Sequence, residues 1–319
     1  MSMISVVIPL YNKAHTILKT IQTVLDQTLT EFELIVVNDG STDEGVEVIE
    51  KNINDPRIKI INQDNKGVSV ARNEGVRIAK NQYIAFLDGD DEWLPNYLET
   101  MVDGIKKFPN AGMFCCAGLI RNSTGIHNRI ATDYRDKIVE ISFFQNPHVF
   151  LHTSATIVTK IEFEKLGGFP VGMKRNQDYA LFFQLALTSK VIYCGTPLSI
   201  YVGDVAGQAT QTKIKEVLKH VMDRYNLVHM RWLETGKLNI DYPTFLRYEV
   251  RHFYLSFLKK KDYASIKYFN NNLNIEIKKC FIPFEFNLYR SRNTRILSYI
   301  FIYLTKVRWR LRGYPRLGK

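Results

Sequence analysis

The sequence predicts an α/β protein with a mostly parallel sheet flanked by helices, followed by a helical C-terminal extension. Over about the first 205 residues, short apolar runs rich in β-branched residues alternate with amphipathic helical patterns, as βαβ units do. Several of these runs end in clusters of Asp, Asn and Gly, and strand patterns stop near residue 210. We therefore expect a sheet domain over residues 1–210, a helical region over 211–290 and a tail helix over 291–319.

The first half of the sheet domain has the clearest alternation. Strands are expected at Ile4–Leu10, Phe32–Val37, Ile58–Ile61 and Tyr83–Leu87. Apolar residues at helical spacing follow the first strand, Ser41 or Thr42 can cap a helix after the second, and Val68–Ala79 is helical after the third. Strands connected in this way run parallel through right-handed crossovers, so their carboxyl ends share one edge of the sheet.

The second half of the domain is less regular. The pattern is lost over residues 121–147, and no element is predicted there. Strands are expected at Gly112–Ile120, Thr153–Val158, Val191–Cys194 and Leu198–Val202, and helices at Leu98–Ile105, Ile161–Leu166 and Gln177–Thr188. Three helices are expected after the boundary, at Lys213–Glu234, Pro243–Lys259 and Tyr263–Asn271.

A dense acidic cluster ends the fourth expected strand. The run Asp88-Gly89-Asp90-Asp91 places three carboxylates within four residues, and in an extended chain Asp88 and Asp90 project to the same side. Such carboxylates repel each other unless one is protonated or a cation bridges them. They suit Mg²⁺ or Mn²⁺ bound to a substrate phosphate, and Gly89 permits a close approach. A polar turn is the alternative, but the position at a strand's carboxyl end favours a ligand site.

Two further polar residues have both a functional and a structural interpretation. Asp39 ends the second strand as Asp88 ends the fourth. Its carboxylate could accept the imide N–H of a uracil, or it could only shape the loop. Arg72 lies on the third helix, where its guanidinium could donate to a base carbonyl or a phosphate, or simply be solvated.

Four motifs that occur in a fixed order favour the functional interpretation of all these residues over the structural one. The chain contains V-V-I-P-L-Y-N, V-V-N-D-G-S-T-D, N-K-G-V-S-V-A-R-N-E-G and F-L-D-G-D-D-E-W-L-P. In this it resembles the family 2 glycosyltransferases, inverting enzymes of the GT-A fold that use nucleotide sugars. The resemblance covers about residues 4–205 and makes residues 1–210 a GT-A catalytic domain.

The resemblance implies roles for individual residues. The nucleoside pocket of a UDP-sugar would be lined by Pro9, Tyr11, Asp39 and Arg72. Asp88 would lie near the ribose, with Gly89 beside it. Asp90, together with Asp88, would hold the Mn²⁺ or Mg²⁺ ion that bridges the diphosphate.

The resemblance also implies a catalytic base. The family has a carboxylate pair, usually Glu-Asp, on a helix that follows a G-G-F segment. Here residues 167–169 are G-G-F, and Gln177-Asp178 follow. Asp178 would be the general base for an acceptor hydroxyl, although the same residue also suits the first turn of a helix. Gln177 replaces the family's Glu, which affects acceptor contacts more than the base.

A second departure from the family concerns a histidine. Many relatives carry one shortly after a Tyr-Arg pair, in the metal or diphosphate site. Here Tyr201 is followed by Val202, Gly203 and Asp204. Asp204 could substitute as an oxygen ligand, or it could be an ordinary loop residue. The seven histidines have no metal-binding spacing, which is typical of surface or core residues.

Charge, cysteines and hydropathy indicate where in the cell the protein is expected. Of the net charge of +11, residues 278–319 carry +10, from eleven Lys/Arg and one acid, Glu285. The four cysteines lack C-x-x-C spacing and are expected to be reduced and buried. No secretory signal is found, and no apolar run approaches the roughly 18–20 residues of a membrane span. A cytoplasmic location is expected.

The tail is amphipathic. Apolar residues form one stripe along residues 293–312, consisting of Ile296, Ile300, Tyr303, Leu304, Val307 and Leu311, widened by Leu297 and Phe301. Basic residues flank the stripe. This pattern favours an anionic membrane surface, with packing on the chain itself or on a partner as the alternative. No nucleic-acid binding is expected, because the stripe is too broad for a phosphate-tracking helix.

The resemblance predicts a metal-dependent transferase that adds a single sugar to a glycan or lipid-linked acceptor, in bacterial surface polysaccharide synthesis. No processive Q-x-x-R-W motif follows the expected catalytic domain. The alternative is a catalytically inactive nucleotide-sugar-binding or scaffold relative, marked by Gln177 and the missing histidine. Dehydrogenases and P-loop enzymes are disfavoured, since their glycine-rich motifs are absent.

Overall fold

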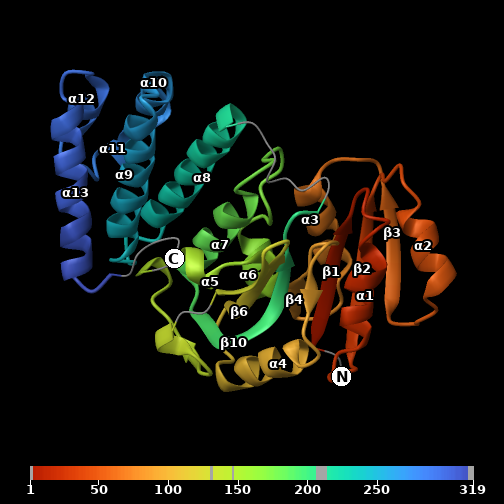
Figure 1. Cartoon of the computed structure of the whole chain (residues 1–319). Helices are drawn as coiled ribbons and strands as arrows, with labels where there is room; N and C mark the ends of the chain where they lie inside the picture. Colours follow the sequence, from red (N-terminus) through yellow and green to blue (C-terminus); the bar gives the residue numbers. More distant parts are fainter. Residues whose placement is uncertain (1–2, 130–131, 146, 206–213, 315–319) are drawn as a thin grey trace.

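The computed structural model describes residues 3–129, 132–145, 147–205 and 214–314 (Figure 1). Its centre is a sheet with the strand order β3-β2-β1-β4-β9-β6-β10-β5. Outside this order, β7 pairs with β6 and β8 pairs with β10. The strands are β1 (Ile4–Leu10), β2 (Phe32–Asp39), β3 (Ile58–Gln63), β4 (Tyr83–Phe86), β5 (Glu92–Trp93), β6 (Met113–Asn122), β7 (Gly125–Arg129), β8 (Ile138–Glu140), β9 (Thr156–Thr159) and β10 (Val191–Val202).

The two halves of the sheet differ in strand direction. Strands β3, β2, β1 and β4 are all parallel, as predicted, and Leu10 of β1 pairs with Asn38 of β2. In the other half β10 runs parallel to β6, but β9 is antiparallel to both β4 and β6. The two short strands expected between residues 191 and 202 form one strand, β10, with an irregularity at Pro197.

Helices cover both faces of the sheet, as the alternation predicted. They are α1 (Ile17–Leu25), α2 (Gly45–Asn52), α3 (Val68–Ile78), α4 (Tyr97–Lys107), α5 (Pro147–Phe150), α6 (Lys160–Lys165) and α7 (Gln177–Thr188). Three short 3₁₀ turns lie in the less regular region, η1 (Thr132–Tyr134), η2 (Phe143–Gln145) and η3 (Thr153–Ala155). The expected strand at 153–158 is therefore a turn followed by β9, while α7 has its predicted bounds.

The central strands are buried on both faces, as parallel strands between helix layers are. In β1, Val7 belongs to one apolar cluster, while Val6 and Ile8 belong to another on the opposite face. Cys115, Cys116 and Cys194 are buried without a disulfide, as predicted, and Cys280 is partly exposed. Burial raises the pKa of the Cys115 thiol to about 12.

The C-terminal helices stand beside the sheet domain (Figure 1). They are α8 (Ile214–Glu234), α9 (Tyr242–Lys260), α10 (Tyr263–Asn272), α11 (Ile275–Lys278), α12 (Glu285–Arg290) and α13 (Arg295–Leu311). Helix α8 packs on α7, and the cluster that contains Val7 continues into these helices as far as Trp309. The predicted boundary near residue 210 lies outside the described residues. None of the helices described is long and apolar enough to span a bilayer.

Candidate active site

The carboxyl ends of β2, β1 and β4 lie side by side at one edge of the sheet. The chain places β2 and β3 on one side of β1 and β4 on the other, and such a switch point is where open α/β sheets bind ligands. Hydrogen bonds join the loops there: Asn12 N–H donates to Ser41 Oγ at 3.2 Å and Ala14 N–H to Asp43 Oδ2 at 2.8 Å. We call this edge the rim.

The acidic loop after β4 lies at the rim. Arg72 Nη2 donates to Asp88 Oδ1, and the Lys13 ammonium lies 2.7 Å from Asp90 Oδ2. A Cβ on Gly89 would lie 3.3 Å from the Pro9 carbonyl oxygen, so the loop and the end of β1 are in close contact. The structure thus brings these sequence-predicted residues together, and it adds Lys13, which no motif indicated.

Arg72 has unused hydrogen-bonding capacity. Its side chain is 3% exposed, and its Nε and Nη1 have no hydrogen-bond partner among the described residues. The guanidinium carbon lies 5.0 Å from the centre of the Phe169 ring. Leaving buried donors unpaired is costly, so an oxygen-rich ligand at the rim would complete this group.

Asp39 is buried beneath the loop that leads to α3. One carboxylate oxygen accepts from Gln63 Nε2 at 2.7 Å and Lys66 N at 2.9 Å, and the other accepts from Gly67 N at 2.8 Å. An ionised carboxylate has about four acceptor positions, which leaves room for one more donor. Tyr11, on the loop after β1, is 45% exposed.

Asp91 is a positioning residue that sequence reasoning missed. It is 1% exposed, and its Oδ2 accepts from Ser154 Oγ at 2.5 Å and lies 3.3 Å from His152 Nε2. Its Oδ1 accepts from Val202 N at 3.1 Å. Burial raises the pKa of Asp91, and the His152 contact opposes that rise. The residue ties the acidic loop to η3 and to the end of β10.

Asp178 lies in the first turn of α7, half-buried. Its Oδ2 is 3.4 Å from Thr153 Oγ1, and its Oδ1 accepts from Tyr179 N at 2.8 Å. The next residue of η3, Ser154, accepts from Asp88 N at 3.1 Å. Adjoining residues of η3 therefore contact Asp178 and the acidic loop, which brings both to the same rim.

Gln177 and Asp204, which stand where the sequence departs from the family pattern, have different surroundings in the structure. The Gln177 Oε1 is buried without a hydrogen-bond partner among the described residues. Asp204 accepts from Ser123 N at 3.0 Å and Ser123 Oγ at 2.8 Å. The backbone hydrogen bond lowers the pKa of this exposed carboxyl. Asp204 therefore closes the β6–β7 turn, which is the ordinary loop role.

Metal binding at the rim would depend on Asp88 and Asp90. Nowhere in the described ranges do three His, Cys, Asp or Glu residues gather as a metal site. Mg²⁺, however, uses only one or two protein carboxylates when substrate phosphates supply further ligands. The Lys13 ammonium at Asp90 shows that this carboxylate accommodates a cation. The donor set fits an ion shared with a diphosphate.

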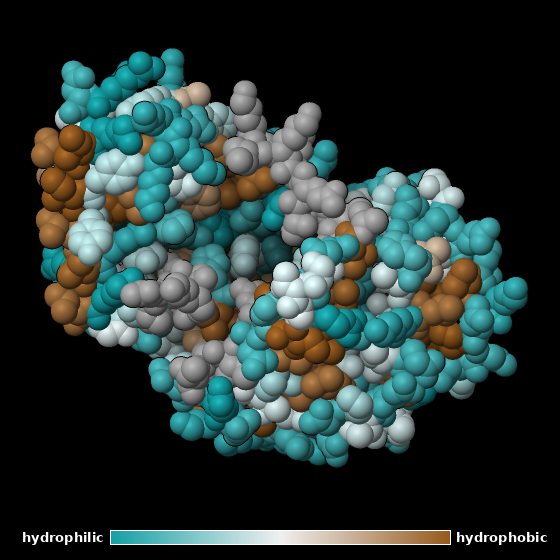
Figure 2. Space-filling model, viewed as in Figure 1, coloured by the Kyte–Doolittle hydropathy of each residue, from teal (hydrophilic) through white to brown (hydrophobic). Residues whose placement is uncertain are grey.

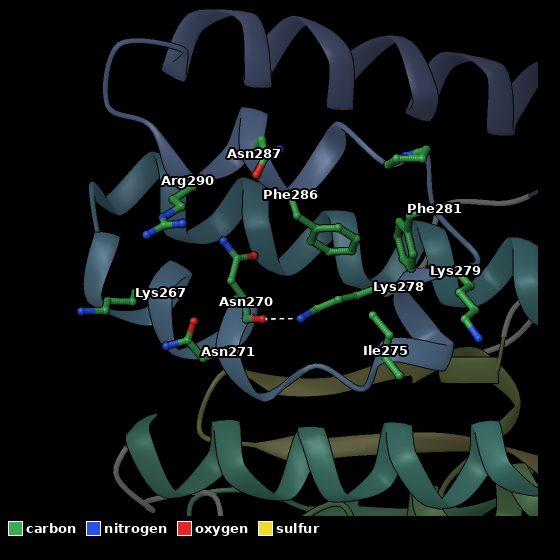
Figure 3. Close-up of a pocket in the computed structure, with 11 residues that line it drawn as sticks. Lys267, Asn270, Asn271, Ile275, Lys278, Lys279, Phe281, Phe286, Asn287 and Arg290 are labelled. Carbon is green, nitrogen blue, oxygen red and sulfur yellow. Dashed lines mark hydrogen bonds between the residues drawn. The ribbon is translucent and has the colours of Figure 1, made fainter.

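The molecular surface is hollowed between the sheet domain and the C-terminal helices (Figure 2). Two further grooves lie within the C-terminal helices. One, of about 610 Å³, is lined by Lys267, Lys279, Arg290 and their neighbours (Figure 3). The other, of about 690 Å³, lies between α9 and α13. Neither is lined by a predicted site residue, so the rim remains the candidate site.

Comparisons with known proteins identify the family of the chain. The profile of Glycosyl transferase family 2 matches residues 5–164. A Rickettsia prowazekii protein described as an uncharacterized glycosyltransferase is 31% identical over 219 residues, which is 67% of this chain and 68% of that protein. WfgD of Escherichia coli, a UDP-Glc:alpha-D-GlcNAc-diphosphoundecaprenol beta-1,3-glucosyltransferase, is 30% identical over 62% of this chain and 76% of its own length.

A solved structure shares the fold over nearly the whole chain. Residues 1–349 of S. aureus TarS, in complex with UDP-GlcNAc, superpose with a TM-score of 0.70 at 16% sequence identity. The match covers 96% of this chain and 92% of the TarS chain. It therefore includes the C-terminal helices as well as the sheet domain.

Proposed function

Since the chain belongs to glycosyl transferase family 2 and is a glycosyltransferase, we propose that it moves a sugar from a UDP-sugar to an acceptor hydroxyl, with inversion at the anomeric carbon. One observation carries the proposal. Adjoining residues of η3 contact the half-buried Asp178 and the backbone of Asp88 in the acidic loop after β4. An acid-lined donor site and a base for the acceptor would need this arrangement.

The donor would bind along the rim. Asp39 would accept the uracil imide N–H, and the unpaired Arg72 donors would bind the nucleotide's oxygens. Pro9, Tyr11 and Gly89 would form the remaining walls. WfgD is named for a UDP-sugar donor and TarS was solved with one, which supports uridine as the nucleoside.

The leaving diphosphate needs positive charge. A Mn²⁺ or Mg²⁺ ion held by Asp88 and Asp90 would neutralise the charge that builds up on it. The protein itself contributes the ammonium of Lys13 and the guanidinium of Arg72, which already contact these two carboxylates. The chain's residues thus balance the acidic loop and hold it in place.

Asp178 would be the general base. An ionised carboxylate within hydrogen-bond reach of an alcohol can take its proton, and Thr153 Oγ1 helps to hold the Asp178 carboxylate in place. The acceptor oxygen would then attack the anomeric carbon from the face opposite the diphosphate. The Gln177 Oε1 has no hydrogen-bond partner among the described residues, and this side chain would be a further contact of the acceptor.

We also propose a cytoplasmic enzyme on the inner face of the cell membrane, where it would add one sugar to a glycan or lipid-linked acceptor of a bacterial surface polysaccharide. The lipid-linked acceptor in WfgD's name and the exposed apolar stripe of α13 support this. Vesicle flotation of Ile300→Ser/Leu304→Ser tests it, because both side chains are exposed and their loss leaves the fold intact. Unchanged flotation would exclude the α13 contact.

Activity is tested by a thermal-shift screen of UDP-, GDP- and dTDP-sugars with Mn²⁺ and Mg²⁺, followed by donor turnover. We expect a UDP-sugar to stabilise the protein and to be turned over. Asp178→Asn should bind the donor almost as the wild type does and lose transfer. Donor binding without any turnover in the wild type would instead favour an inactive nucleotide-sugar-binding relative.

A further inference from the structure

Helix α13 packs with one face and leaves an apolar face exposed. Ser298, Ile302 and Trp309 are buried against the neighbouring helices. The exposed side chains, from 38% to 83% exposed, are Ile296, Leu297, Ile300, Tyr303, Leu304, Val307 and Leu311. Figure 2 shows them as a hydrophobic band along the outer edge of the molecule. We call these seven residues the apolar face.

A cationic groove of about 690 Å³ lies between α9 and α13. Its basic lining residues are Arg247, Arg251, Lys306, Arg308 and Arg312, and its aromatic ones are Tyr248, Phe281, Phe301 and Trp309. No Asp or Glu is among the described residues that line it. Its size suits a small ligand or a head group.

The positive charge of the groove is only partly compensated within the described part of the chain. Arg251 is neutralised by the buried Glu285, with N–O distances of 3.0 and 2.5 Å. Arg247, by contrast, bonds only to neutral oxygens, Thr244 Oγ1 at 3.2 Å and Cys280 O at 3.4 Å. Of the groove's cations, only Arg251 forms an ion pair with a described carboxylate. Several uncompensated cations in one groove repel each other, and an anion would relieve that repulsion.

The titration of Arg247 agrees with this charge distribution. Burial lowers the pKa of the Arg247 guanidinium, and repulsion from Arg251 and Arg312 lowers it further, while Cys280 and Glu285 oppose part of this fall. Both causes would be offset by an anion in the groove.

The groove opens along the border of the apolar face. Residues four apart lie on the same side of a helix, so Leu304, Arg308 and Arg312 form one row. Arg308 and Arg312 line the groove, while Leu304 belongs to the apolar face. If the apolar face enters the acyl boundary of a bilayer, these guanidiniums lie at the level of the head groups.

We propose that the groove between α9 and α13 binds the phosphate of an anionic membrane-lipid head group, and so anchors the apolar face in the membrane interface. Guanidinium groups bind phosphate through paired N–H donors, and Arg247 and Arg312 supply such groups from both walls. The inference rests on the proposed membrane location. It adds a lipid-phosphate site that is separate from the rim.

The test measures binding of the full chain to phosphatidylcholine vesicles with and without phosphatidylglycerol. The variant is Arg247→Gln/Arg312→Gln. The control is Lys267→Gln/Arg290→Gln, which removes the same charge from the neighbouring groove shown in Figure 3. We expect the wild type to prefer the anionic vesicles, the variant to lose about tenfold in affinity for them, and the control to lose about twofold or less.

Three results of these binding measurements would overturn the inference. One is an equal loss of affinity for anionic vesicles in the variant and the control, because binding would then depend on net charge and not on the groove. Another is equal binding of the wild type to both vesicle types. The third is soluble glycerol phosphate or inorganic phosphate stabilising the protein in a thermal shift without any vesicle preference, which would make the site one for free phosphate.

Donor turnover without vesicles separates this inference from the proposed catalysis. If turnover persists while lipid selectivity is absent, the groove assignment fails and the transferase proposal stands. If lipid selectivity is present while turnover is absent, the transferase proposal fails and the groove assignment stands. Concentration-dependent dimerisation that is lost in Ile300→Ser/Leu304→Ser would mean that a second copy covers the apolar face, and would also overturn the inference.

Discussion

Replacing Glu249 by Gln should destabilise the fold by about 3 to 5 kcal/mol, because it leaves Arg224 buried without its counter-charge. The side chains of Arg224 and Glu249 are 2% and 7% exposed, with 2.9 Å between Arg224 Nη2 and Glu249 Oε1. The Arg224 guanidinium also lies 5.6 Å from the Tyr179 ring centre. This pair therefore connects α8 and α9 to the helix that carries Asp178.

The lowered pKa of Glu249 leads to a similar estimate of how much this pair stabilises the fold. Burial alone would raise the pKa of this carboxyl, but Arg224 and His148 outweigh burial and lower it from 4.5 to about 2. That difference corresponds to about 3 kcal/mol. Because the folded pKa lies below the unfolded one, the stabilisation is complete above about pH 4.5 and is lost as the pH falls towards 2.

The assay is urea denaturation followed by circular dichroism, at about pH 7 and at steps below pH 5. The free-energy difference between wild type and Glu249→Gln should stay constant down to about pH 4.5 and shrink below it. Glu276→Gln is the matched control, since its exposed pair with Lys279 should contribute less than about 1 kcal/mol. Equal costs for the two substitutions, or a pH-independent difference, would refute the reasoning.

Three further predictions concern the rim, the β6–β7 turn and the backbone. Asp90→Ala should abolish Mn²⁺-dependent UDP binding in calorimetry, and retained metal-dependent binding would exclude Asp90 as the ligand. Asp204→Ala should leave kcat within about twofold of wild type, because the carboxylate bonds only to Ser123 among the described residues; a tenfold loss would give it a role in the site. Gly195→Ala should cost about 3 kcal/mol or more, because its Cβ would lie 1.7 Å from the Tyr134 carbonyl oxygen. The matched control is Gly104→Ala, whose added Cβ makes only ordinary van der Waals contacts, so the free energy of unfolding should rise by up to about 1 kcal/mol. Similar denaturation midpoints for the two alanine variants would contradict the packing argument.

The parallel half of the sheet could be predicted because its signals are local. Strands β1, β2 and β4 are each a mostly apolar run, and the polar residues at the end of each mark the rim. The extended-chain argument for Asp88 and Asp90 was wrong, because residues 89–90 form a turn that is closed by the hydrogen bond from Asp91 N to Asp88 O at 3.0 Å. It did not predict that Asp91, which lies next to them, is buried against Ser154.

The remaining contacts depend on residues that are distant in sequence. Lys13 reaches Asp90 across 77 positions, and η3 gains its importance only because β9 inserts between β4 and β6. No periodicity over residues 121–147 encodes that insertion. In α13, Ile302 and Trp309 offer a second apolar side, so the pattern alone could not tell which face packs on the protein.

The central claim is that one rim gathers the nucleotide site, the metal ligands and the base. Anomalous diffraction from a crystal soaked with Mn²⁺ and UDP tests it most directly. We predict one manganese peak bound by Asp90, with the uracil at Asp39 and the diphosphate on the side of Asp178. A manganese or uridine site elsewhere, such as the grooves of the C-terminal helices, would contradict the account.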